Sequence, residues 1–245
     1  MTKPDIRSTM DAFSLAIDPE GTRVVFQPIV DLRHKRLFAV EALARCQIPG
    51  LTSPVALFED AVDKGYVGRL GRLIRELTVQ GCPDIPVFTN VHPEELTQRW
   101  LVRPDDPIYG HQSDVYIEIT ESVPFSHFEL CVSMLKEIQS RGRVHLVIDD
   151  LGAGYSNLQR IVDLAPAIVK LDMQLVRGID RLTRKQQLVK SIVAMCTAQG
   201  ARVVAEGIET VAELHAVIDA GVHFGQGYLL ARPGSPVPPV CWPEP

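Results

Sequence analysis

The segment VHLVIDDLGAG, residues 144–154, joins an apolar run to two adjacent acids and a glycine-rich turn. Its first residues are mostly aliphatic and β-branched, a pattern typical of a buried strand. Asp149 and Asp150 follow at the carboxyl end, and the two glycines after them give the backbone the freedom to turn. The segment therefore predicts a buried strand that ends in acidic side chains.

The same arrangement, an apolar strand followed by an amphipathic stretch, recurs in both directions along the chain. Strands that alternate with helices predict an α/β fold, and eight of them predict a TIM-like (β/α)8 barrel. The turn-like residues 31–36 join the first two strands into a hairpin, so one strand near the N-terminus is predicted to be antiparallel. The predicted strands are residues 23–30, 37–43, 86–91, 115–120, 144–148, 167–171, 201–205 and 222–225. The predicted helices are residues 54–80, 124–141, 156–163 and 211–220, and the first of them is interrupted at Gly65 and Gly68. Two more are predicted with one boundary each: a helix that starts at residue 92, and a helical stretch after strand six that ends at residues 199–200.

The length of 245 residues suits a single domain, because one α/β barrel needs about 250. We expect an N-terminal extension at residues 1–22, the barrel domain at 23–233 and a proline-rich tail at 234–245. No internal repeat or low-complexity linker divides the chain. No sensory domain fits beside the barrel, so a regulator is expected to be a separate protein or a region outside this chain.

Composition excludes several classes of partner. The formal net charge of -5 gives no basic surface for a nucleic-acid polymer, whereas a small anionic ligand is compatible with local cations or metals. The five cysteines are odd in number and form no CxxC pair, so neither a disulfide framework nor a zinc site is predicted. No run of about 18 apolar residues and no signal-peptide pattern is present, so no membrane partner is expected and a cytoplasmic location is favoured.

Polar residues stand at the carboxyl ends of the predicted strands. In a barrel these ends meet at one rim, so residues far apart in sequence converge there. A single acid after a strand is usually a solvated loop residue or a helix N-cap, but that interpretation does not account for the whole set. The set comprises Glu41, Asn90, Glu118, Glu121, Asp149, Asp150, Lys170 and Glu206.

Carboxylates gathered at one mouth repel one another, so they need either raised pKa values or bound cations. Oxygen ligands without cysteine or paired histidine select hard ions such as Mg²⁺ or Mn²⁺, and the amide oxygen of Asn90 suits such a site. The adjacent Asp149 and Asp150 can serve two metals, and a two-metal site suits phosphoester cleavage. Lys170 would hold the attacking water, stabilise developing charge, or form a structural ion pair. The residues alone indicate metal-assisted hydrolysis without naming a substrate.

At this point the motifs resemble the EAL domain family, the cyclic di-GMP phosphodiesterases of bacterial signalling. The similar segments run in the family's order from about residue 23 to 233. They are FQPIVDL (26–32), EAL with Arg45 (41–45), TNV (89–91), EITES (118–122), DDLGAGYS (149–156), KLD (170–172), AEGIET (205–210) and QGY (226–228).

The resemblance implies a role for each matching position. The implied metal ligands, for two Mg²⁺ or Mn²⁺ ions, are Glu41, Asn90, Glu118, Asp149 and Asp150. Glu41, Lys170 and Glu206 are the implied catalytic residues, with Lys170, Glu206 and Gln226 around the metals and the attacking water. Glu121 would brace the loop that begins at Asp149. The implied dinucleotide contacts are Gln27, Leu43, Arg45, Asp172 and Glu209, with Gln226 beside them, and Asp172 could approach the metals instead.

Some positions depart from the family pattern. Cys46 replaces the usual Trp and Ala44 a frequent Leu, and Met173 replaces the Arg that often follows the KID motif. None of these changes removes an implied ligand. Leu151 and Ala153 alter the loop through which the family couples dimerisation to metal binding, and the segment from Arg45 to Pro54 is short. The resemblance also implies a homodimer.

The resulting prediction is hydrolysis of cyclic di-GMP to linear pGpG. A second hypothesis is a catalytically weak or inactive receptor or protein-interaction module, because a fold does not guarantee its chemistry. Loss of an implied active-site residue would mark such a module, yet Glu41, Asp149, Asp150 and Lys170 are all present. A third hypothesis is an unrelated barrel hydrolase that acts on another phosphoester.

Overall fold

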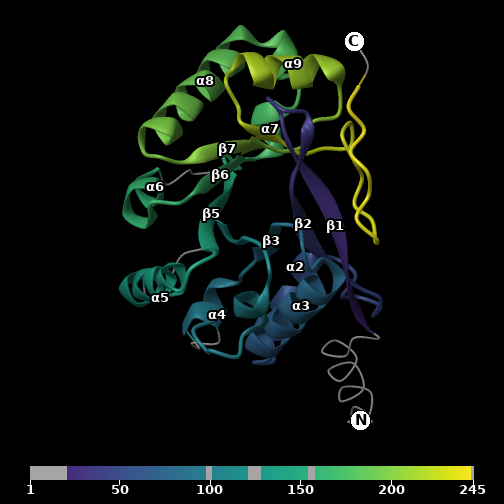
Figure 1. Ribbon diagram of the computed structural model, residues 1–245, viewed down its shortest axis with the longest axis vertical. Coiled ribbons are helices and arrows are strands. Elements are labelled where there is room, and N and C mark those ends of the chain that lie inside the picture. The colour runs from purple at the N-terminus through teal and green to yellow at the C-terminus, as the bar shows by residue number, and fades with distance from the viewer. Residues whose placement is uncertain (1–20, 98–100, 121–127, 154–157, 244–245) are drawn as a thin grey trace, which may run out of the picture.

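The computed structural model describes residues 21–97, 101–120, 128–153 and 158–243. Within these ranges eight strands close into a barrel in chain order, with helices outside it (Figure 1). The predicted α/β barrel is therefore confirmed. The strands are β1 (Thr22–Asp31), β2 (Arg36–Cys46), β3 (Val87–Asn90), β4 (Val115–Thr120), β5 (Val144–Leu151), β6 (Ile168–Leu171), β7 (Arg202–Ala205) and β8 (Phe224–Gly225).

Strand β1 runs against both of its neighbours, as the hairpin prediction requires. Thr22 lies opposite Cys46 of β2, and Val30 lies opposite Gly225 of β8. The remaining neighbouring strands pair in parallel. Asp31 closes the hairpin turn, because its Oδ1 accepts hydrogen bonds from the backbone N–H groups of Arg33 and His34, at 3.0 and 2.9 Å.

The helices cover the outside of the barrel. In Figure 1, α2 and α3 lie at one end of the view and α8 and α9 at the other, with the strands between them. The helical elements are α2 (Pro54–Asp63), α3 (Val67–Gly81), α4 (Pro93–Thr97), α5 (Phe128–Ser140), α6 (Gln159–Leu164), α7 (Met173–Val176), α8 (Thr183–Ala198) and α9 (Val211–Asp219), with the 3-10 turns η1 (Pro107–Gly110) and η2 (Ile179–Arg181).

Two helix predictions need correction. The break near residue 65 uses Gly65 alone, at a φ of 74°, whereas Gly68 is buried inside α3. One glycine with a positive φ is enough to redirect the chain, so a second interruption is unnecessary. The continuous helix predicted after strand six is instead divided into α7, η2 and α8, because Gly178 takes a φ of 67°.

The inside of the barrel holds an apolar layer with one side chain from each strand. Rings stack within it, and those of Phe88 and Tyr116 have centroids 4.4 Å apart. This layer fills the barrel below its mouth. Its members are Ile29, Ala39, Phe88, Tyr116, Val147, Ile168, Val204 and Phe224.

A buried charge cluster lies outside the barrel, between α3, α4 and η1. Arg75 donates to Glu95 Oε2 at 2.7 Å and to Asp106 Oδ2 at 2.9 Å, and each side chain is at most 1% exposed. Glu95 Oε1 also accepts from the backbone N–H of His92 at 3.2 Å. The cluster therefore ties α3 to the loop that follows β3.

The predicted proline-rich tail contains no helix or strand over its described part, although it packs closely on the barrel. Gly234 and Phe26 exchange two backbone hydrogen bonds, at 2.8 and 3.0 Å. The domain limits at residues 22 and 234 stay predictions. Four of the cysteines, Cys46, Cys82, Cys196 and Cys241, are free thiols. In the described ranges no helix has the length and apolar character needed to cross a membrane.

Candidate active site

A polar layer lies directly above the apolar layer, at the barrel mouth. Side chains two residues apart on a strand point to the same face. Each strand therefore contributes one polar residue, two positions away from the residue that it contributes to the apolar layer. In β1 the order is reversed, since that strand runs the other way. The polar layer comprises Gln27, Glu41, Asn90, Glu118, Asp149, Lys170, Glu206 and Gln226.

Lys170 is the centre of this layer. Its Nζ lies 2.6 Å from Glu118 Oε1 and 2.6 Å from Glu206 Oε1. Asp149 Oδ1 is 3.2 Å away and Glu41 Oε2 is 3.5 Å away. The lysine side chain is 1% exposed. One buried ammonium group thus faces four carboxylates contributed by four different strands or their ends.

This crowding shifts the titration of the cluster. Burial alone would lower the pKa of Lys170, but the carboxylates of Asp149, Glu118 and Glu206 outweigh it and hold the pKa well above its ordinary value. Burial raises the pKa of Glu206 to about 8, even though Lys170 opposes that shift. Burial likewise raises the pKa of Glu118, and the nearby Glu41 and Asp149 add to the effect. The cluster holds more negative charge than one lysine neutralises.

Amide side chains complete the layer. Asn90 Nδ2 donates to Glu118 Oε2 at 3.0 Å, which leaves the amide oxygen of Asn90 for another partner. Gln226 Nε2 donates to Glu41 Oε2 at 2.6 Å and to Gln27 Oε1 at 3.2 Å. Gln226 Oε1 is buried and accepts no hydrogen bond from the described residues. The mouth therefore presents an acceptor that the described part of the chain does not satisfy.

A compact group of acids forms one side of the mouth. Oxygen atoms from Asp149, Asp150 and Glu206 all lie within 4.8 Å of one another. Asp150 takes the left-handed region at a φ of 60°, and burial, with Asp149 adding, raises its pKa to about 6. Oxygen donors in such number, with uncompensated negative charge, fit a hard divalent cation.

An acidic pocket of about 460 Å³ opens above these acids. Its lining includes five carboxylate side chains and one guanidinium, that of Arg177. Gly207, Gly227 and Tyr228 form further parts of the wall. The carboxylates are those of Glu41, Asp150, Asp172, Glu206 and Glu209.

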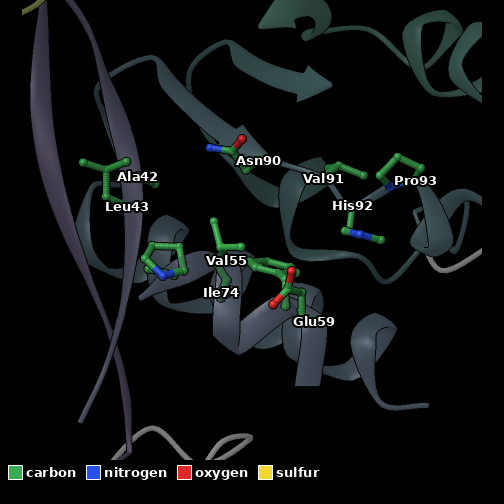
Figure 2. A pocket seen from close by; sticks show the side chains of 12 residues that line it. Ala42, Leu43, Val55, Glu59, Ile74, Asn90, Val91, His92 and Pro93 are labelled. Carbon is green, nitrogen blue, oxygen red and sulfur yellow. The ribbon is translucent and has the colours of Figure 1, made fainter. Parts of the chain in front are cut away.

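A second pocket of about 430 Å³ lies between α2 and strands β2 and β3 (Figure 2). Its lining is mostly apolar, with Glu59, Asn90 and His92 as polar members. The Phe58 and His92 rings stack with centroids 6.1 Å apart. Figure 2 shows Leu43 and Asn90 on facing sides of it, so this apolar pocket adjoins the polar layer through Asn90.

The structure separates the implied dinucleotide contacts into two groups. Gln27, Asp172, Glu209 and Gln226 line the acidic pocket, whereas Leu43 lines the apolar one. Arg45 Nη1 donates to the carbonyl of its neighbour Ala44 at 2.8 Å. Glu121 lies outside the described residues, as do Tyr155 and Ser156.

Sequence reasoning gave no site role to several residues of these walls, among them Arg177, Tyr228 and His92. Arg177 follows Met173 by four residues, so the spacing of one helical turn could have revealed that both reach the same pocket. Tyr228 belongs to a quoted motif but received no role.

The comparisons with known proteins agree with this architecture. The family model of the EAL domain matches residues 10–233. The chain belongs to the EAL domain family. Among curated relatives, it is 32% identical over 231 residues to cyclic di-GMP phosphodiesterase PA2567 of Pseudomonas aeruginosa, covering 89% of this chain and 39% of that protein. It is 33% identical over 226 residues to cyclic di-GMP phosphodiesterase RocR of the same organism, covering 85% and 56%. This EAL domain thus spans well under two thirds of either relative.

Solved structures place the EAL domain among similar barrels. BlrP1 of Klebsiella pneumoniae, in a complex with manganese and cyclic di-GMP, aligns with a TM-score of 0.77 at 30% identity, over 91% of this chain and 58% of that one. The EAL domain of Xanthomonas citri FimX, in complex with cyclic di-GMP, aligns with a TM-score of 0.77 over 94% of each chain. At 19% identity, that second likeness supports the fold alone.

Proposed function

We propose that this EAL domain hydrolyses one phosphodiester bond of cyclic di-GMP to give linear pGpG, with two divalent ions, Mg²⁺ or Mn²⁺, at the barrel mouth. The observation that carries the proposal is the buried polar layer, in which four carboxylates surround Lys170 at 2.6–3.5 Å. Burying so many like charges destabilises a fold unless cations bind there, so the layer fits a metal-binding function.

The carboxylates and the amide have the chemistry to hold such ions. Glu41, Asn90, Glu118, Asp149 and Asp150 would be the ligands, and Glu206 joins them because it groups with the two aspartates. Bound divalent ions supply an activated water at neutral pH and neutralise charge on phosphate oxygens. The described residues offer oxygen atoms alone for this purpose, which favours Mg²⁺ or Mn²⁺ over zinc.

The chain's own groups would position the reactants. Lys170 stays protonated, since its carboxylate partners hold its pKa above the ordinary value, so its ammonium can donate to the attacking water or to a phosphate oxygen. Gln226 and Gln27 form a hydrogen-bonded pair beside Glu41, and the unsatisfied Gln226 Oε1 can accept a hydrogen bond from water. The acidic pocket above these groups is large enough to receive part of a dinucleotide.

The identity of the proposed substrate is inferred from the relatives. PA2567 and RocR are named cyclic di-GMP phosphodiesterases, and BlrP1 was solved with manganese and cyclic di-GMP. Those relatives are about one third identical and longer than this chain, so substrate and activity here are inferences from similarity. Homodimerisation, a cytoplasmic setting and a separate regulatory partner are further proposals of the same kind.

The test is turnover of cyclic di-GMP by the purified chain with Mg²⁺ or Mn²⁺, with the product identified. We expect pGpG to form and EDTA to stop the reaction. Cyclic di-GMP that binds but stays intact would instead support a receptor, and metal-dependent turnover of other phosphoesters alone would support a different hydrolase.

Two variants test the metal-holding residues. Glu41→Ala and Asp149→Asn each remove a carboxylate from the polar layer, so turnover should fall to background with the fold retained. Glu137→Ala is the matched control, because Glu137 is 41% exposed on α5 and pairs with Arg141. Near-normal rates in either test variant would contradict the metal assignment.

A further inference from the structure

An exposed ion pair forms one wall of the acidic pocket. Arg177 follows the short helix α7, and Glu209 lies in the loop after β7. Arg177 Nη2 donates to Glu209 Oε1 at 3.2 Å, with side-chain exposures of 60% and 47%. Both residues line the pocket. A surface ion pair of this exposure contributes little to stability, so its place in the wall needs another explanation.

The pair presents donors and acceptors side by side. A guanidinium has five N–H donors arranged as a fork, and a carboxylate has two acceptor oxygens. A phosphate offers acceptors alone, so it would leave the carboxylate of Glu209 without a donor. A group with adjacent donors and acceptors matches the pair better.

Guanine is such a group. Its N1–H and N2–H donors lie side by side and fit the two oxygens of a carboxylate. Its O6 and N7 acceptors fit the fork of an arginine. Adenine lacks the pair of adjacent donors and carries an amino group at the position of O6. The Arg177–Glu209 pair is therefore complementary to guanine and poorly complementary to adenine.

A planar surface lies in the same pocket. The Tyr228 side chain is 51% exposed and lines the pocket, with the guanidinium of Arg232 4.3 Å from the ring centroid. Tyrosine rings are common stacking surfaces for unpaired bases. The pocket thus combines a stacking surface with a hydrogen-bonding edge.

We infer that Arg177 is a specificity-determining residue, which together with Glu209 recognises a guanine base of the substrate through hydrogen bonds. The inference rests on the proposed function, because it assumes a guanine dinucleotide as substrate. Arg177 acts on base binding, so its loss should raise KM and leave kcat nearly unchanged.

The test compares wild type with Arg177→Gln and Arg177→Lys on cyclic di-GMP and on cyclic di-AMP. In both variants we expect KM for cyclic di-GMP to rise about 10-fold, the effect of losing one bidentate base contact, with kcat within about 2-fold of wild type. Cyclic di-AMP turnover should change little, so discrimination between the substrates falls. Lysine keeps the charge but lacks the fork, so it should fail to restore discrimination.

Two further variants sharpen the test. Arg181→Gln is the matched control, because Arg181 is 84% exposed and pairs with Asp180 near the same helix. It should leave both substrates unaffected. Met173→Arg combined with Arg177→Met moves the guanidinium one helical turn along the same wall, and should recover part of the lost affinity.

The outcomes separate the two proposals. If wild type neither binds nor cleaves cyclic di-GMP, the proposed function fails. If wild type cleaves it and Arg177→Gln retains its KM and discrimination, the inference about Arg177 is wrong. The inference would also be overturned if Arg177→Gln raised KM equally for both substrates, or if Arg177→Lys kept the wild-type KM and discrimination. Either result would indicate an effect of charge in place of base recognition.

Discussion

The Nζ of Lys170 and the Oε1 of Glu118 lie 2.6 Å apart, and neither side chain is more than 1% exposed. A carboxylate buried this completely is stable in the ionised form only beside a cation. Lys170 is also shared with Asp149, Glu206 and Glu41. Removal of either partner should therefore disturb the whole polar layer.

Lys170→Met should lower turnover by about 100-fold or more, because it removes a positioned donor from the mouth. In metal-free protein it should also lower the free energy of unfolding by about 3–5 kcal/mol, since the carboxylates lose their buried cation. A cyclic di-GMP turnover assay measures the first effect, and urea unfolding in EDTA, compared with Mn²⁺, measures the second. Lys136→Met, at an exposed site on α5, should change neither quantity. Unchanged turnover in Lys170→Met would refute the role of the lysine.

Metal-free protein should become less stable as the pH rises from about 5 to 9. The pKa values of Asp150 and Glu206 are raised to about 6 and about 8, so in this interval the folded state binds protons that the unfolded state has released. Stability from such groups is present at low pH and is lost as the pH passes the folded pKa. Melting temperatures measured in EDTA across this range test the prediction.

Saturating Mn²⁺ should reduce that decline, because a cation stabilises the ionised acids. Glu206→Gln should reduce it as well, since the amide does not titrate. A melting temperature in EDTA that rises steadily between pH 6 and 9 would contradict the assigned direction of these shifts.

Gly71→Ala should destabilise the protein by about 1–3 kcal/mol through overpacking. A Cβ at Gly71 would overlap the carboxylate of Glu95, which is buried and held by Arg75. Gly110→Ala is the matched control, because a Cβ there meets nothing within 4 Å and the position has no positive φ. Chemical unfolding of both variants should separate them clearly, and equal stabilities would show that the charge cluster is able to shift.

Thr210→Ala should lower the free energy of unfolding by about 1 kcal/mol. Thr210 Oγ1 accepts from Glu213 N at 3.2 Å, and Glu213 Oε2 accepts from Thr210 N at 3.1 Å, which together form a capping box at the start of α9. Thr197→Ala, whose hydroxyl only donates to a carbonyl inside α8, should cost less. Thermal unfolding compares the two, and a smaller effect at Thr210 would contradict the capping argument.

Much of the barrel could be predicted from the sequence because most of the apolar strand segments carry a polar side chain near their carboxyl ends. The polar position marks the end of β3 at Asn90, whereas β5 continues two residues past Asp149, to Leu151. The hairpin prediction likewise followed from the short polar turn after Asp31. By contrast, the inner apolar layer could not be separated from the outer core, since both faces of the barrel strands are apolar.

Contacts between residues far apart in the sequence could not be predicted. In the sequence Arg75 is one of several charged residues on an amphipathic helix. In the structure it is buried and donates hydrogen bonds to Glu95 and Asp106, which lie 20 and 31 residues further along the chain. The fourfold contacts of Lys170 depend on strand register, which the sequence does not specify. The pairing of Arg177 with Glu209, 32 residues away, is a further contact of this kind.

The reversed direction of β1 determines where preceding polypeptide meets the barrel. Thr22 lies opposite Cys46 at the mouth end of β2, and the carbonyl of Gly21 accepts from Gln47 N at 3.1 Å. In an all-parallel barrel the first strand would start at the opposite rim. Here the polypeptide that precedes residue 21 joins the barrel at its catalytic rim, on the same side as the acidic pocket.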